Sequence, residues 1–169
     1  VESSIDTVND YLTLEWNREP CTIVLDVTED LPQGSAEELA NVTDVLGTFT
    51  TSYVNSGFAR QANVENGAVL IDGITLYPGE EFSTYETVAP FTEANGYYPA
   101  GSYMNGKVVD SLGGGICQVS STIFNAVARA NLEITSRSPH AWPSTYVNIG
   151  EDATVNWPNL DFKFTNNTS

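Results

Sequence analysis

Basic side chains are scarce in this chain: six lysines and arginines stand against 22 aspartates and glutamates, a formal net charge of −16. Such an excess of negative charge repels phosphate backbones and anionic headgroups, so nucleic acid and membrane surfaces are poor partners. Long hydrophobic runs are missing as well. No stretch approaches the roughly 18 apolar residues of a membrane span, and we expect no direct membrane insertion. Because the chain opens with Val1 and no signal-peptide pattern, we interpret it as a processed fragment.

Histidine and cysteine are also rare, which limits metal chemistry. The chain has one histidine, His140, and two cysteines, Cys21 and Cys117. A zinc site needs three or four ligands, which these distant residues do not readily supply, and the scattered carboxylates argue against a calcium cage. We therefore expect neither a metal nor another cofactor. One candidate cysteine pair does not identify the redox compartment.

The residue patterns predict few helices and many short strands. Helical periodicity or capping marks residues 4–17, 36–41, 59–72 and 116–131, and β-rich composition marks 22–27, 45–54, 74–77, the surroundings of Val147, and 154–164. Asn105-Gly106 predicts a hairpin between residues 97–104 and 107–109. We expect an α+β fold, a single compact domain of mostly antiparallel strands with a few helices. A domain boundary near residue 45 separates residues 1–44 from 45–169.

Cys117 stands at the predicted start of a helix, directly after Gly113-Gly114-Gly115 and one further residue. The apolar stripe of that helix comprises Ile116, Val119, Ile123, Val127 and Ala130. Cys117 lies roughly 120° from the centre of this stripe, whereas a structural cysteine would lie on the packed face. The N–H groups and dipole of a helix N-terminus stabilise a thiolate. The N–H groups of Cys117 and Gln118 are candidates for an oxyanion hole.

A thiolate nucleophile needs a proton acceptor and donor, and His140 is the one imidazole present. Two prolines and Trp142 bracket it in a stiff loop. Asp152 and Asn148 are both candidates to orient the ring. Arg137 is either a clamp for a substrate carboxylate or part of a structural salt bridge.

Several sequence segments resemble the VanW family of bacterial cell-wall proteins. The matching segments are Gly113–Thr122, Arg137–His140, Asp152–Val155, Phe49–Tyr53, Asn63 and Pro78–Ser83. Together they cover about residues 45–169. Residues 1–44 resemble the C-terminal part of a peptidoglycan-binding-like domain, or serve as a linker.

The resemblance implies a cysteine L,D-transpeptidase that forms 3-3 peptidoglycan cross-links through a thioester acyl-enzyme. Cys117 would be the nucleophile and His140 the base, and we add Asp152 as the third catalytic residue. The expected substrate-binding residues are Gly114, Gly115, Gln118, Ser120, Arg137 and Trp142. The partners would be peptidoglycan stem peptides, and the location extracellular or in the cell wall, with the full-length protein anchored to the membrane. The alternative is a noncatalytic peptidoglycan-binding or scaffold module, in which the Cys117 motif only shapes a helix entry.

Overall fold

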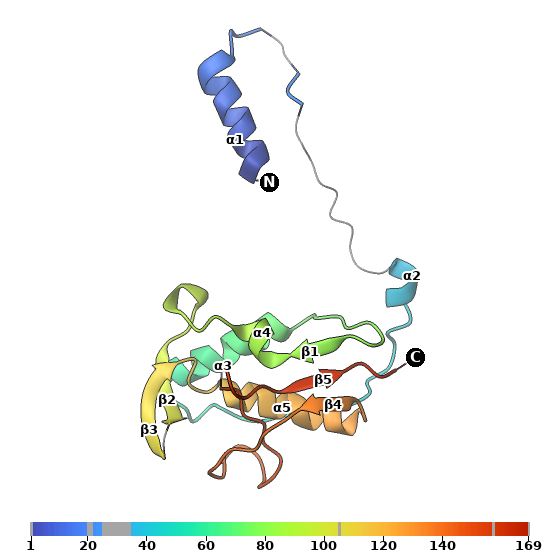
Figure 1. Ribbon diagram of the computed structural model, residues 1–169, viewed down its shortest axis with the longest axis vertical. Helices are drawn as coiled ribbons and strands as arrows, with labels where there is room; N and C mark the ends of the chain where they lie inside the picture. The colour runs from blue at the N-terminus through green and yellow to red at the C-terminus, as the bar shows by residue number, and fades with distance from the viewer. Residues whose placement is uncertain (1, 20–21, 25–34, 105, 157, 169) are drawn as a thin grey trace. The chain divides into compact units, whose positions relative to one another are not determined.

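The computed structural model describes residues 2–19, 22–24, 35–104, 106–156 and 158–168. The chain divides into two compact units, Val1–Asp44 and Val45–Ser169 (Figure 1). The first unit contains helix α1 (Glu2–Asp10), a π-helical turn η1 (Tyr11–Glu15) and the short helix α2 (Ala36–Leu39). These helices confirm the expected helical segments at 4–17 and 36–41. Of the strand expected at 22–27, residues 22–24 form no strand and the rest lies outside the described residues.

The second unit is built around two helices of equal length. They are α3 (Phe58–Ile71) and α5 (Ile116–Arg129), with the short helices α4 (Thr84–Val88) and η2 (Glu93–Asn95) between them in the sequence. The antiparallel hairpin joins β2 (Pro99–Met104) to β3 (Lys107–Leu112) directly before α5. A second antiparallel sheet has the order β1-β5-β4, with β1 (Glu81–Ser83), β4 (Glu133–Ser136) and β5 (Lys163–Thr165). The predicted α+β class is confirmed.

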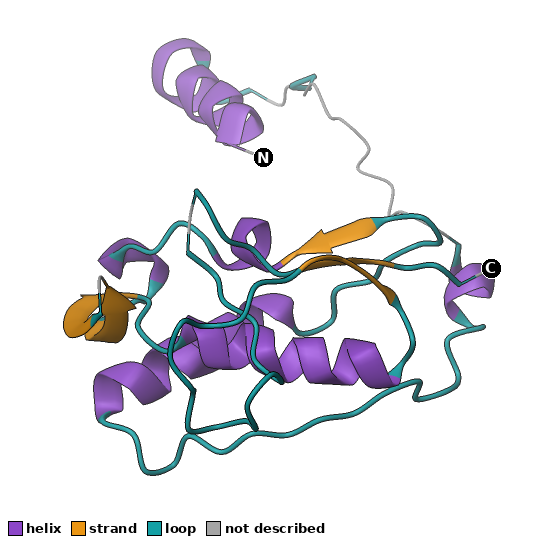
Figure 2. Cartoon of the chain, turned by 60° about the horizontal axis from the view of Figure 1, so that its bottom comes forward, coloured by secondary structure: helices purple, strands orange, loops and turns teal. Residues whose placement is uncertain are grey.

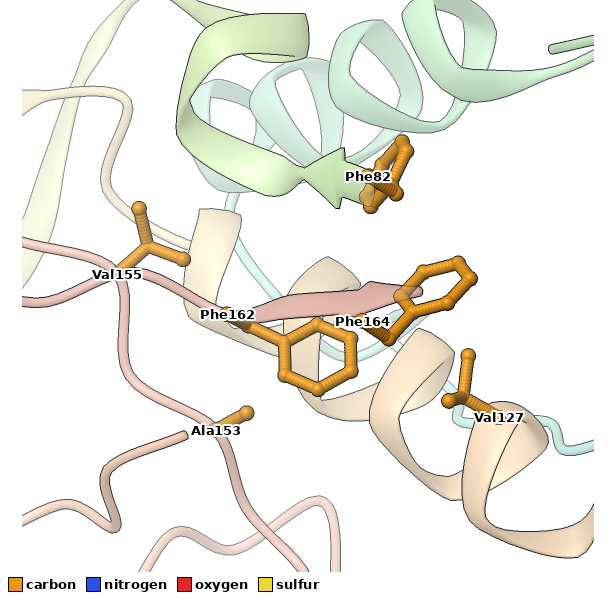
Figure 3. Packing of buried hydrophobic residues seen from close by; sticks show 6 residues of the cluster. All are labelled: Phe82, Val127, Ala153, Val155, Phe162 and Phe164. Carbon is orange, nitrogen blue, oxygen red and sulfur yellow. The ribbon is translucent and has the colours of Figure 1, made fainter. Parts of the chain in front are cut away.

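The β1-β5-β4 sheet covers one side of the helices (Figure 2). Phe82 on β1 and Phe164 on β5 are register partners, and both pack in one core cluster with Val127 of α5 and the fully buried Phe162 (Figure 3). A second cluster joins α3, α4 and the start of α5 through Val64, Val88, Tyr97, Ile116 and Val119. Helix α5 belongs to both clusters. Its predicted apolar stripe is confirmed, since Ile116, Val119 and Val127 are buried.

The segment over residues 45–54 is extended but forms no strand. It lies along α5 instead: a Cβ on Gly47 would be 2.3 Å from the carbonyl oxygen of Ala126. Gln118 donates from its side chain to the hydroxyl of Thr51 and the carbonyl of Ser52. Helix side chains thus take the place of a neighbouring strand as hydrogen-bond partners.

Other strand predictions were wrong in position. Residues 74–77 and the surroundings of Val147 form no strand. Among residues 154–156 and 158–164, which the structure describes, there are only an isolated bridge between Asn156 and Leu160 and the beginning of β5. Strand β4 was not predicted, and β1 was indicated only by Phe82, after the expected turn at Pro78-Gly79. Both are very short and are defined by pairing with β5, so their own residues carry little periodic signal.

Candidate active site

The glycine turn before α5 is tightly packed. Gly113 and Gly115 adopt left-handed φ angles of 78° and 112°, which side chains rarely accept. Gly114 is pressed against β2, because a Cβ there would lie 2.2 Å from the carbonyl oxygen of Ala100. The buried side chain of Asn63 donates to the Gly114 carbonyl at 2.9 Å and also bonds both main-chain groups of Tyr98. The turn that carries Cys117 is therefore fixed from α3 and β2.

Cys117 follows this turn as the second residue of α5, and its side chain is partly exposed. Its sulfur faces the main chain of Val155: the Val155 N–H donates to Sγ, and Sγ can donate to the Val155 carbonyl, each at 3.5 Å. An N–H donor pointing at sulfur stabilises the thiolate form. Val155 thus brings a second chain segment to the Cys117 sulfur.

His140 lies in the loop after β4 and is held by Asp152. Its Nδ1 lies 2.6 Å from Asp152 Oδ2, and the same oxygen accepts the His140 main-chain N–H. Arg137 donates to the carbonyls of Asp152 and Gly150 at 2.8 and 2.7 Å. Since Nδ1 is engaged, Nε2 is the ring nitrogen left for a reacting group.

The ionisable groups of this site favour one another's charged forms: the pKa of His140 is raised and that of Asp152 is lowered. A hydrogen bond from the ring to Cys117 is the main cause that raises the pKa of His140, against the opposing effect of burial. The charge of Cys117 and the contacts with Asp152 raise it further. Burial opposes ionisation of Asp152, but hydrogen bonds from His140 hold the pKa of its carboxyl below the usual value. The arrangement suits a thiolate and imidazolium pair oriented by a carboxylate.

Cys117 and His140 open into a cleft of about 700 Å³. Its walls come from the 52–60 region, the β2–β3 hairpin, the glycine turn and the segments 144–146 and 154–156. A cleft of this size accommodates a short peptide. Thiol, imidazole and carboxylate together can transfer a proton to and from a nucleophilic sulfur.

The expected substrate-binding residues separate into two groups. Gly115 and Gln118 line the cleft, whereas Gly114, Ser120, Arg137 and Trp142 do not. Ser120 is fully buried and donates to the Ala153 carbonyl, and Trp142 is exposed away from the cleft. The main-chain N–H of Gln118, one of the two oxyanion-hole candidates, donates to the Gly115 carbonyl at 2.9 Å, so it is already engaged within the turn.

The cleft also contains residues that the sequence reasoning missed. Arg60, Tyr146 and Thr154 all line it. Burial, and then the charge of Cys117, raise the pKa of Tyr146, although a hydrogen bond to Ser121 has the opposite effect. Among the buried side-chain atoms of the described residues, only Thr154 Oγ1 lacks a hydrogen-bond partner. The scarcity of basic residues could have drawn attention to Arg60, but no local pattern marks Tyr146.

Other candidate ligands do not gather at this site. Within residues 2–19, 22–24, 35–104, 106–156 and 158–168, no three histidine, cysteine or acidic side chains lie close enough to hold a metal ion. In the same parts of the chain, no helix has the length and apolar character to cross a bilayer. Cys21 lies outside the described residues. A disulfide between Cys21 and Cys117 would therefore involve a residue that the structure does not describe. Asn148, the other candidate to orient His140, donates to Glu151 instead.

Comparison with known proteins supplies a family. The family described as VanW like protein matches residues 59–169. The uncharacterized protein YoaR of Bacillus subtilis (strain 168) is 41% identical over 136 residues, which are 80% of this chain and 45% of that protein. The vancomycin B-type resistance protein VanW of Enterococcus faecalis (strain ATCC 700802 / V583) is 31% identical over 111 residues, 63% of this chain and 40% of that protein. The chain thus spans less than half of either relative. No solved structure matches it.

Proposed function

The chain belongs to the VanW-like protein family, and on this premise we propose that it is a cysteine-dependent L,D-transpeptidase of bacterial peptidoglycan. The observation that carries the proposal is the meeting of Cys117 with the Asp152-bound His140 in one peptide-sized cleft. These three residues come from a helix, a loop and a C-terminal segment. A scaffold that only needed to shape a helix entry would not require an imidazole and a buried carboxylate behind the cysteine.

In the first step, the Cys117 thiolate attacks the carbonyl of the third residue of a stem peptide. The carbon–nitrogen bond to the terminal D-amino acid breaks, and the His140 imidazolium gives its proton to the departing amine. The product is a thioester between Cys117 and the shortened stem. The raised pKa of His140 suits this role, because it favours the protonated ring that donates to the departing amine.

In the second step, the side-chain amine of another stem peptide attacks the thioester. His140 is now neutral and accepts the proton of that amine, the sulfur leaves as a thiolate, and a 3-3 cross-link forms. Asp152 does not gain a proton in either step. Its short contact with Nδ1 fixes the tautomer and keeps Nε2 towards the reacting atoms.

Location and partners belong to the same proposal. Stem peptides are the expected partners, and an extracellular or cell-wall location, with membrane anchoring in the full-length protein, places the cleft beside them. The name of the Enterococcus faecalis relative links that protein to vancomycin resistance. The assignment of residues 1–44 to a peptidoglycan-binding-like domain stays a prediction.

Intact-mass spectrometry tests the proposed reaction. The wild-type chain is incubated with a tetrapeptide stem, and we expect an adduct equal to the tripeptide acyl group on Cys117. Cys21→Ala should form the adduct and Cys117→Ala should not. Addition of an amine-bearing stem should discharge the adduct and yield the cross-linked dimer.

The same experiment separates the two candidate functions. If the wild-type chain forms no adduct with stem peptides, although iodoacetamide modifies Cys117, the transpeptidase proposal is wrong. The noncatalytic peptidoglycan-binding module would then be the better description. An adduct on Cys21 alone would also contradict the proposed mechanism.

A further inference from the structure

Arg60 is positioned at the wall of the cleft, beside the turn that carries Cys117. It lies in the first turn of α3, and its Nη1 donates to the hydroxyl of Ser56 at 3.0 Å. Its side-chain stem packs on Gly115, where a Cβ would be 2.9 Å from Arg60 Cγ. Its guanidinium carbon lies 5.8 Å from the centre of the Tyr146 ring. Backbone, hydroxyl and ring contacts thus hold Arg60 near the nucleophile.

Among the described residues, no acidic side chain forms an ion pair with Arg60. No aspartate or glutamate is among the described residues that line the cleft, although the chain has 22 of them. The ion pairs between described residues join Arg137 and His140 to Asp152 and Lys163 to Glu81, and none of them includes Arg60. An arginine in a partly enclosed cleft without a carboxylate partner leaves its planar fork of donors open to an external anion.

Arg137, one of whose expected roles is to clamp a substrate carboxylate, lies in a different position. It does not line the cleft, and its donors already bind the carbonyls of Asp152 and Gly150. Its guanidinium also stacks on the ring of Phe124, with 4.8 Å from the guanidinium carbon to the ring centre. Arg137 is therefore a support for the Asp152 segment, and Arg60 is the cleft residue able to pair with a substrate.

We propose that Arg60 binds the free C-terminal carboxylate of the acyl-donor peptide. This inference rests on the proposed function and adds to it a residue that sets specificity for a free carboxylate one residue beyond the attacked carbonyl. In such a peptide the carboxylate belongs to the amino acid that departs, and it is separated from the scissile nitrogen by a single carbon. A guanidinium beside the Cys117 turn would therefore select the last peptide bond for cleavage. It would also give an acidic protein a local site for an anionic ligand.

Binding measurements on the full chain test this inference without catalysis. Isothermal titration calorimetry on Cys117→Ala compares a stem tetrapeptide that has a free C-terminal carboxylate with the same peptide as a C-terminal amide. The carboxylate form should bind more tightly. Adding Arg60→Gln should weaken its binding about tenfold to a hundredfold, as for loss of a charge-assisted hydrogen bond, and leave the amide unchanged. Arg60→Lys should be intermediate. Lys163→Gln, which removes one positive charge on β5, is the control and should change neither affinity.

Three results would overturn the inference. In the first, Arg60→Gln weakens both peptides equally, so that Arg60 acts through Gly115 and Tyr146 as a structural residue. In the second, Arg60→Gln changes neither affinity. In the third, the parent Cys117→Ala protein binds the amide as tightly as the carboxylate, a result that does not depend on folding of the Arg60 variants.

The thioester assay separates failure of the inference from failure of the proposed function. If wild type and Arg60→Gln acylate Cys117 equally well, the inference alone is wrong. If neither peptide binds and wild type forms no adduct, both are wrong.

Discussion

At the scale of single residues, His140 interacts with the Cys117 sulfur and the Asp152 carboxylate, and both raise the pKa of its ring. The contact with Cys117 raises the pKa of the ring most, and the contacts with Asp152 add to it, while burial acts against both. A histidine whose pKa is raised on folding contributes stability below its unfolded pKa of about 6.5. That contribution is lost as the pH rises through the folded value. Acidification from above the folded pKa down to about pH 6.5 therefore increases this contribution, which then stays constant until Asp152 gains a proton.

We expect Cys117→Ala to lower the pKa of His140, because the substitution removes the largest cause of the upward shift. Proton NMR of the imidazole ring across pH measures this directly, and assignment is simple because the chain has one histidine. Cys21→Ala is the matched control and should leave the titration curve in place. Superimposable curves for wild type and Cys117→Ala would show that sulfur and ring do not interact.

At the scale of secondary-structure elements, hydrogen bonds hold the polar side of α5 against the segment 151–155. Ser121 accepts the buried N–H of Ala153 at 2.9 Å, and Ser120 donates to the Ala153 carbonyl at 2.7 Å. Asn125 donates to the carbonyl of Glu151 at 2.6 Å. Ser121, which lies on this polar side of α5, is fully buried. These bonds position Asp152, which contacts His140, and Val155, which contacts the Cys117 sulfur.

Ser121→Ala should destabilise the chain by about 1–3 kcal/mol, because the Ala153 N–H would be left buried without an acceptor. Urea denaturation followed by circular dichroism measures the change in the free energy of unfolding. Ser136→Ala is the control: Ser136 is partly exposed and donates to the carbonyl of Asp161, so water can replace the lost hydroxyl. An unchanged urea midpoint for Ser121→Ala would contradict the role given to this contact.

At the scale of the whole second unit, α5 connects the two hydrophobic clusters and carries Cys117 at its N-terminal end. Phe162 is fully buried in the cluster below the sheet, where it packs on Phe124 and Phe164 with ring centres 5.7 and 5.9 Å apart. The chain segment from Asp152 to Val155, which completes the site, enters the same cluster through Ala153 and Val155. Core packing and site geometry are therefore linked.

Phe162→Ala should lower the free energy of unfolding by about 3–5 kcal/mol, as for a large cavity in a packed core. The measurement is urea denaturation of the full chain, read as a shift in midpoint at constant slope. Phe58→Ala offers a matched control, since Phe58 is 75% exposed and its loss should cost less than about 1 kcal/mol. Equal shifts for the two variants would mean that the cluster is not the main core.

The sequence alone determined the features that depend on local order. Helical periodicity predicted α3 and α5, Asn-Gly predicted the hairpin, and the glycines before Cys117 marked the helix entry, because each of these follows from neighbouring residues. The uniqueness of His140 and the family resemblance then paired it with Cys117. Tertiary structure decided the rest: that Asp152 and not Asn148 contacts His140, that Arg60 and not Arg137 lines the cleft, and that β1 and β4 exist as partners of β5. These contacts join residues that are distant in sequence and lie in irregular segments. They depend on tertiary packing, which no short sequence pattern predicts.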